Sequence, residues 1–256
     1  MLRRELRVNL RSFIIWSVVA IALFSIAYLV YPSIINNYDP EMLDKLVQSM
    51  PKNMQEAFNM DISSISSVLG WFKTEGYTYL ILILGLYSAI LGANILTKEE
   101  NDKTIEFLYS KPISRNKILF KKILYGIIYI VAIVLVNTIF NLIAMHISGI
   151  TDSNKEIILL NLSPLLACLP IFFITLFISS FFRKTRKTLG LGLLIVFISY
   201  FLSMISEMGD NTEFLKYFSV YTLTDSRNII ENTQLDFIHI VVALVIIIIS
   251  GVLLFI

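Results

Sequence analysis

Six long apolar segments, none with an acidic residue in its middle, constrain what this chain of 256 residues can fold into. A bilayer core of about 30 Å is crossed by about 20 apolar residues in a helix. The apolar runs are continuous rather than alternating, which favours helices over barrel strands. The chain is 56% apolar and 16% charged, against about 45–50% and about 25% in soluble domains. The sequence therefore predicts a single all-α membrane domain with transmembrane helices at 13–31, 77–96, 118–147, 157–182, 189–205 and 237–256.

Details of these segments refine the prediction. The first is not a signal peptide, because it is about 19 residues long and no small-x-small cleavage site ends it. The third is longer than lipid requires, and Lys121 and Lys122 near its start predict first turns at the headgroups. In the fourth, Pro164 or Pro170 can kink the helix or mark its start. The sixth ends at Ile256 without a basic tail, which suggests that the natural chain is longer.

The distribution of basic residues predicts the orientation of the chain. Fifteen Lys and Arg fall on the side that holds the N-terminus and the second and fourth loops, and six fall on the other side. Loops rich in Lys and Arg stay in the cytoplasm. We therefore expect both termini in the cytoplasm, residues 32–76 outside the cell membrane, and 97–117 inside it. The near-neutral net charge gives no indication of nucleic-acid binding.

Two segments outside the spans have helical patterns of their own. In a helix, residues 1–12 place leucines on one face and arginines on another, which predicts an interfacial helix in the headgroup plane. Alternatively, the arginines only anchor the first span on the cytoplasmic side through their positive charge. The outer loop, residues 32–76, has apolar stripes at helical spacing. We expect its helices to pack on the outer ends of the spans.

The spans carry two kinds of unusual residue. Gly85, Ala89 and Ala93 recur at intervals of four, which permits close helix contact in lipid; the sequence does not decide whether the contact lies within one chain or between two. Asn94, Asn137 and Asn141 are polar groups that need partners in hydrocarbon. They either bond neighbouring helices or line a translocation path.

Several kinds of chemistry lack a recognisable motif. There is no Gly-x-x-x-x-Gly-Lys-Ser/Thr loop for ATP phosphates, no His-Glu-x-x-His zinc motif and no Gly-x-Ser-x-Gly elbow. The lone Cys168 excludes an intrachain disulfide and a multi-cysteine metal site. We therefore expect no catalytic residue, no metal and no cofactor in this chain.

The segment from Thr97 to Arg115 is an acidic stretch on the otherwise basic side. Asn101 or Asp102 can cap a short helix there, with Ile105 and Leu108 on one side, and Ser114 can cap the third span. Pro112 would end that short helix. The stretch is either a rigid helix between two spans, able to transmit a push, or a solvated turn of mixed charge.

The residues from Glu99 to Arg115, Glu-Glu-x-x-Lys-Thr-Ile-Glu-Phe-Leu-Tyr-Ser-Lys-Pro-Ile-Ser-Arg, resemble the signature of ABC-2 type transporter permeases. Lys103 departs from it, because the family usually has glycine there. The interfacial helix, the six spans and the large first outer loop are also similar to that family. The positions that match are Glu99, Glu100, Thr104, Glu106, Leu108, Pro112, Ser114 and Arg115.

The resemblance implies an exporter subunit that works as a dimer, with a copy of itself or a related permease, and is driven by separate ABC ATPase subunits that bind ATP and Mg²⁺. Relatives of this short form include exporters of antimicrobial or toxic peptides, so an amphipathic peptide is a candidate cargo. The alternatives are a transporter or channel without a motor, and a membrane sensor or immunity protein. The expected ATPase contacts, forming a coupling helix, are Glu99, Glu100, Asp102, Thr104, Ile105, Glu106 and Leu108.

Overall fold

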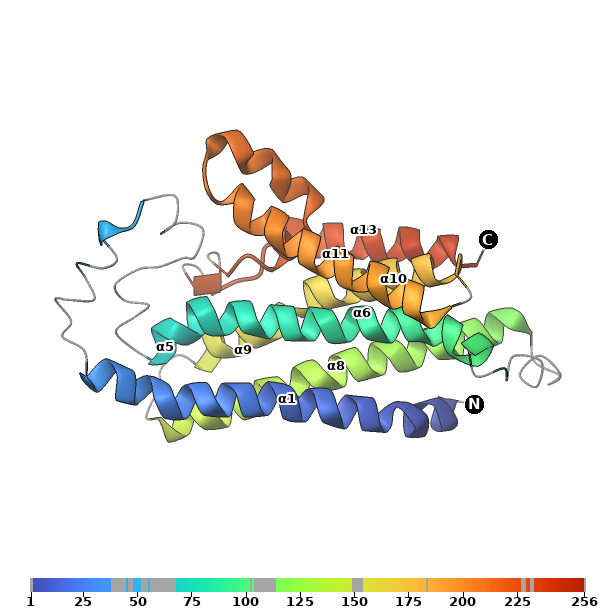
Figure 1. Ribbon diagram of the computed structural model, residues 1–256, viewed down its shortest axis with the longest axis horizontal. Helices are drawn as coiled ribbons and strands as arrows, with labels where there is room; N and C mark the ends of the chain where they lie inside the picture. Colours follow the sequence, from blue (N-terminus) through green and yellow to red (C-terminus); the bar gives the residue numbers. More distant parts are fainter. Residues whose placement is uncertain are drawn as a thin grey trace.

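The computed structural model describes most of the chain as helix. The described residues are 2–37, 45, 48–51, 55, 68–101, 103, 114–148, 154–182, 184–226, 229–230 and 233–255, and every regular element among them is helical. The longer elements lie roughly along one axis (Figure 1). In chain order they are α1 (Leu2–Asn37), α5 (Val68–Trp71), the π-helical turn η1 (Phe72–Gly76), α6 (Tyr77–Asn101), α8 (Arg115–Ile147), α9 (Asn154–Leu162), α10 (Leu165–Ser179), α11 (Thr185–Ser206), the 3₁₀ helices η2 (Asp210–Phe218) and η3 (Tyr221–Thr224), and α13 (Phe237–Leu253).

Helix α6 occupies the centre of the bundle and packs most extensively against α10 and α11. Glycine makes this approach possible, because a Cβ at Gly92 would lie 2.7 Å from the backbone oxygen of Phe172 on α10. A Cβ at Gly85 would lie 2.0 Å from the hydroxyl of Tyr221. Gly85, from the row of small residues, and Gly92 beside that row therefore serve close contacts within one chain.

The predicted fourth span is two helices. Helix α9 ends at Leu162, and α10 begins after Ser163 and Pro164. Proline has no amide hydrogen to donate within a helix, so the helix is interrupted there. Helical hydrogen bonding resumes when the amide of Cys168 donates to the carbonyl of Pro164 at 2.8 Å. Pro170 lies inside α10 without ending it.

Five of the described helices are long and apolar enough to cross a membrane: Arg4–Ile26 within α1, Leu69–Asn101, α8, the α9–α10 pair, and α11. The expected sixth span, 237–256, is the shorter apolar helix α13 of 17 residues. Many large apolar side chains of α1, α11 and α13 are exposed, as expected of surfaces that face lipid rather than water. The chain is therefore a multi-pass helical membrane protein.

The start of the chain differs from the sequence prediction. Residues 1–12, expected as a separate interfacial helix, are described from Leu2 onward as the first turns of the continuous helix α1. No proline or glycine lies between residues 2 and 31 to interrupt the helical ladder. Most of the large outer loop lies outside the described residues. Its first residues, to Asn37, continue α1, residues 45, 48–51 and 55 are described as short pieces, and α5 and η1 at its end run directly into α6.

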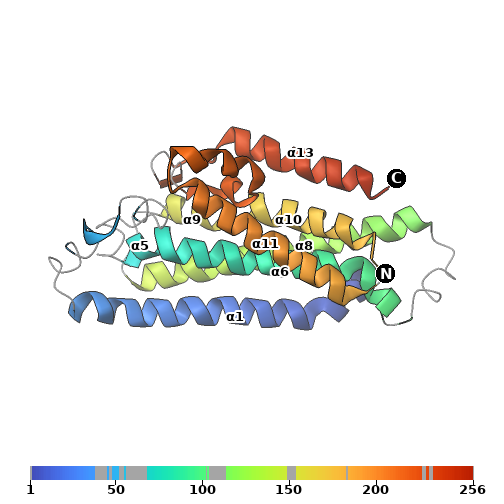
Figure 2. The same cartoon turned by 45° about the horizontal axis from the view of Figure 1, so that its top comes forward.

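Both chain termini lie at the same end of the bundle (Figures 1 and 2). The end of α6, the start of α8, and the α10–α11 connection lie there too. Thr185, the first residue of α11, donates a 2.9 Å hydrogen bond to Thr97 near the end of α6. We call this the basic end, because Arg4, Arg7, Lys117, Arg186 and Lys187 belong to it. The other is the opposite end.

At the opposite end, aromatic packing joins α1 to the segment that leads into α6. The ring of Phe24 lies 6.4 Å from that of Trp71 and 6.2 Å from that of Phe72. The ammonium group of Lys73 lies 2.6 Å from a carboxylate oxygen of Glu156, which ties η1 to α9. These contacts fix the start of the central helix at the opposite end.

Candidate functional site

At the basic end, one buried lysine joins α8 to the last turns of α6. Lys122 is 3% exposed. Its ammonium group donates to the backbone oxygen of Ile95 at 2.6 Å and forms an ion pair with the carboxylate of Glu99. A buried charge is tolerated when it is paired and hydrogen-bonded. The lysine therefore lies between helices, and the headgroup depth expected for the first turns of α8 stays a prediction.

The sequence contained a signal for this burial. Lys122 shares one helical stripe of α8 with Ile118, Tyr125 and Tyr129, spaced at i, i+4, i+7 and i+11, and all four are buried. A lysine inside a buried stripe calls for an acidic partner, and the acidic residues that follow the preceding span, Glu99 and Glu100, were candidates.

The adjacent Glu100 has a different environment from Glu99. One of its carboxylate oxygens, Oε2, is buried and makes no hydrogen bond within the described part of the chain. A groove of about 420 Å³ opens beside it, with both charged and apolar walls. Residues from four helices line this groove, among them Glu99, Glu100, Arg115, Lys122, Ser180, Leu254 and Phe255.

The remaining predicted contact residues all lie outside the described residues. These are Asp102, Thr104, Ile105, Glu106 and Leu108. Lys103 is described, and it adopts a φ of 55° while its amide donates to the carbonyl of Glu100 at 3.2 Å. Left-handed φ just after a helix is the conformation that glycine adopts most easily. Ser114 precedes α8 at the predicted position, but its side chain makes no capping hydrogen bond.

The three asparagines proposed for a path have distinct roles. Asn141 receives a hydrogen bond from Tyr28 of α1 at 3.3 Å and donates one to Asn161 of α9 at 2.6 Å. Asn137 donates to Ile133 on its own helix, and its Oδ1 is buried without a partner in the described structure. Asn94 is partly buried. The structure therefore assigns interhelical bonding to Asn141, and the translocation path along the three asparagines stays a prediction.

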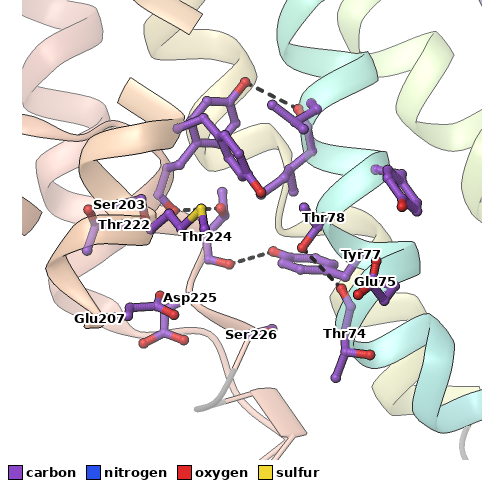
Figure 3. A pocket seen from close by; sticks show the side chains of 16 residues that line it. Thr74, Glu75, Tyr77, Thr78, Ser203, Glu207, Thr222, Thr224, Asp225 and Ser226 are labelled. Atoms are coloured by element: carbon purple, nitrogen blue, oxygen red, sulfur yellow. Dashed lines mark hydrogen bonds between the residues drawn. The ribbon is translucent and has the colours of Figure 1, made fainter. Parts of the chain in front are cut away.

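Toward the opposite end, a cavity of about 270 Å³ separates the start of α6 from the segment that follows α11 (Figure 3). Glu75, Thr74 and Thr78 lie on one wall, and Glu207 and Asp225 lie on the other. The hydroxyl of Tyr77 closes the cavity by donating to the carbonyl of Thr224 at 2.6 Å. We call this cavity the outer pocket.

The chemistry of the outer pocket is acidic, hydroxylic and aromatic. Among the described residues that line it there is no Lys, Arg or His, and three of them are Tyr79, Tyr200 and Tyr221. Burial raises the pKa of Tyr221 well above its usual range, so its hydroxyl stays a neutral donor, 3.4 Å from the carbonyl of Ile81. Among the described residues, no three His, Cys, Asp or Glu side chains form a group that could hold a metal ion. This pocket was not predicted, because its walls come from distant parts of the chain.

Among the described residues, a central helix packed against apolar helices, with ion pairs near the two ends of the bundle, is typical of a polytopic helical membrane protein. The chain belongs to a known family of this class, the ABC-2 family transporter proteins. The model of that family matches residues 1–256. Members of this family are transmembrane permease components of ABC transporters, and separate ABC ATPase subunits hydrolyse the ATP. No curated protein and no solved structure matches the chain.

Proposed function

We propose that the chain is the permease subunit of an ATP-driven exporter, with the basic end in the cytoplasm and docked on an ABC ATPase subunit. The observation that carries the proposal is the groove beside Glu100, which lies at the base of the connection between α6 and α8. That connection holds the sequence that resembles the family signature. A buried carboxylate oxygen without a partner favours a cationic donor from another protein.

In this proposal, the connection 102–113 is the coupling element between the two proteins. Glu100 supplies a charge-assisted contact, and Asp102, Thr104, Ile105, Glu106 and Leu108 supply the rest of the surface. ATP and Mg²⁺ stay on the ATPase subunit. Closure of the ATPase pushes the connection, and α6 carries the displacement toward the outer pocket because it contacts both ends of the bundle.

The proposed assembly holds two permease chains, identical or related, and α13 completes six spans in each. The 17 residues of α13 are few for a bilayer of about 30 Å, but local thinning accommodates a short helix at modest cost. The large exposed apolar surface of α1 and α11 is available to lipid or to the second permease.

We further propose an amphipathic peptide as cargo. Support comes from the outer pocket, whose tyrosine rings, hydroxyl groups and carboxylates suit a chain that carries both apolar and cationic side chains. Stimulation of the ATPase by candidate peptides, compared with the same peptides after their lysines are acetylated, tests this part by itself.

The proposal is tested by purifying the tagged chain from its native membrane and measuring how much ABC ATPase subunit comes with it. Glu100→Lys places a positive charge where a cationic partner is expected. Loss of a buried charge pair at an interface costs about 2–5 kcal/mol, so recovery of the ATPase should fall by about tenfold or more.

The control is Glu213→Lys, the same charge reversal on η2 at the opposite end, and it should leave recovery unchanged. Vesicles that contain the permease alone should show no substrate flux. Flux without the ATPase would favour a motor-independent channel, and equal recovery from the Glu100→Lys and wild-type proteins would refute the assigned contact.

A further inference from the structure

The ammonium group of Lys122 contacts two successive turns of α6 at once. Ile95 and Glu99 are four residues apart, so they lie one above the other on the same face of that helix. The lysine donates to the backbone of the first and pairs with the carboxylate of the second. One side chain of α8 thereby fixes both the distance and the axial position of the end of α6.

This clamp lies directly beneath the connection between the two helices. Glu99 is two residues from the end of α6, and Lys122 is two turns inside α8, which begins at Arg115. The same turn of α6 is also held by α11, through the hydrogen bond from Thr185 to Thr97. Thr97 is 1% exposed. The two ends of the connection are therefore anchored to one packed body.

Separating the two helices would break this pair and leave the buried ammonium group of Lys122 without the partly buried carboxylate that neutralises it. Such a loss is strongly unfavourable, so α6 and α8 are expected to move together. We infer that Lys122 is a positioning residue for the coupling element, and that Glu99 is its internal anchor rather than a contact for the ATPase. This inference rests on the proposed function, and it separates Glu99 from Glu100, which the sequence placed in one role.

The test compares Lys122→Met, which removes the charge at similar length, with Lys122→Arg, which keeps it. Each variant is reconstituted with the ATPase in proteoliposomes, and three quantities are measured: ATPase affinity, ATP hydrolysis and substrate moved per ATP. We expect Lys122→Met to keep ATPase affinity within about twofold and to lower substrate moved per ATP about fivefold to tenfold, a typical size for coupling changes. Lys122→Arg should retain most of the coupling, and the exchange Lys122→Glu with Glu99→Lys should recover part of it.

The matched control is Lys121→Met, at the neighbouring position of α8, whose side chain is partly exposed. It should leave substrate moved per ATP unchanged. A folded Lys122→Met protein that couples as the wild type does would overturn the inference, and so would an equal effect of Lys121→Met.

A second measurement does not need the ATPase. Spin labels at Asn101 and Lys117, both exposed, report the distance between the two ends of the connection. We expect a narrow distribution in the wild type and in Lys122→Arg, and a broad one in Lys122→Met. A narrow distribution in Lys122→Met refutes the clamp itself. A wild-type chain that binds no ATPase refutes the proposed function instead, so the two failures are distinguishable.

Discussion

Asn141 of α8 donates a 2.6 Å hydrogen bond to the side-chain oxygen of Asn161 on α9, and both side chains are fully buried. Asn161 in turn donates to the carbonyl of Ile157 on its own helix. Both the side-chain oxygen and the side-chain nitrogen of Asn161 therefore have a hydrogen-bond partner. Tyr28 adds α1 to the same group through the other side of Asn141. Three helices are therefore joined by polar bonds inside an apolar bundle.

Removing this junction should destabilise the bundle. Asn141→Ala takes away two interhelical hydrogen bonds, and we expect the free energy of unfolding to fall by about 1–2 kcal/mol, since single bonds of this kind average about 0.6 kcal/mol in membranes. Reversible unfolding in mixed micelles measures the change, and a double-mutant cycle with Asn161→Ala isolates the pair.

The control for the asparagine experiment is Asn137→Ala, one turn away. The amide of Asn137 bonds only to Ile133 of its own helix among the described residues, so its loss should cost clearly less. Equal costs at the two positions, or a coupling energy of zero between Asn141 and Asn161, would contradict the interhelical role.

The contact between α6 and α10 predicts a different response at two glycines. In Gly92→Ala, the new methyl group meets Thr175 Oγ1 at 2.2 Å and the backbone oxygen of Phe172 at 2.7 Å. Because backbone cannot move aside locally, we expect a loss of about 1–3 kcal/mol in stability. Thermal unfolding in detergent measures it.

Gly190 on α11 supplies the matched substitution. A Cβ there has no atom within 4 Å, and alanine is the better helix former by about 0.5–1 kcal/mol. Gly190→Ala should therefore be neutral or stabilising. A stable Gly92→Ala variant would mean that the helices are farther apart than described.

The helices were largely predictable, whereas their contacts were not. Apolar runs of about 20 residues dictate spans whatever their neighbours are, and so α8 and α11 begin and end within about four residues of the predicted bounds. The break before Leu165 followed from Pro164. The sequence could not decide whether Glu99 or Glu100 pairs with Lys122, because the pairing depends on how α6 and α8 pack. For the same reason the outer pocket, formed by residues as distant as Glu75 and Asp225, left no local pattern.

The candidate site shows the same division. The acidic pair was found from the motif, yet the difference between Glu99 and Glu100 depends on the position of Lys122 across 23 residues of sequence. The unusual Lys103 was recognised from the resemblance alone. Its φ of 55° gives the physical reason for a glycine at that position.

A glycine substitution at Lys103 is predicted to stabilise the protein, whereas most substitutions destabilise a protein. A residue with a side chain loses about 1–2 kcal/mol of stability in the left-handed region, and glycine does not. Glycine instead loses about 0.5–1 kcal/mol, because its unfolded chain has more conformational entropy. Lys103→Gly should therefore raise the stability slightly, by up to about 1 kcal/mol. Lys103→Val, which is β-branched, should lower it. The same unfolding assay ranks the three proteins, and a ranking with valine above glycine would be inconsistent with the described backbone.

The proposed orientation predicts which cysteines react from outside the cell. Cys168, the only native cysteine, is buried and should give little background. Tyr217 on η2, at the opposite end, is 80% exposed, and Lys187 at the basic end is also exposed. We expect a membrane-impermeant maleimide to label Tyr217→Cys in intact cells, and to label Lys187→Cys only after permeabilisation. Lys and Arg at the basic end outnumber those predicted for the other side of the membrane, so this end should stay inside. Labelling of Lys187→Cys in intact cells would invert the topology and remove the ATPase from the groove beside Glu100.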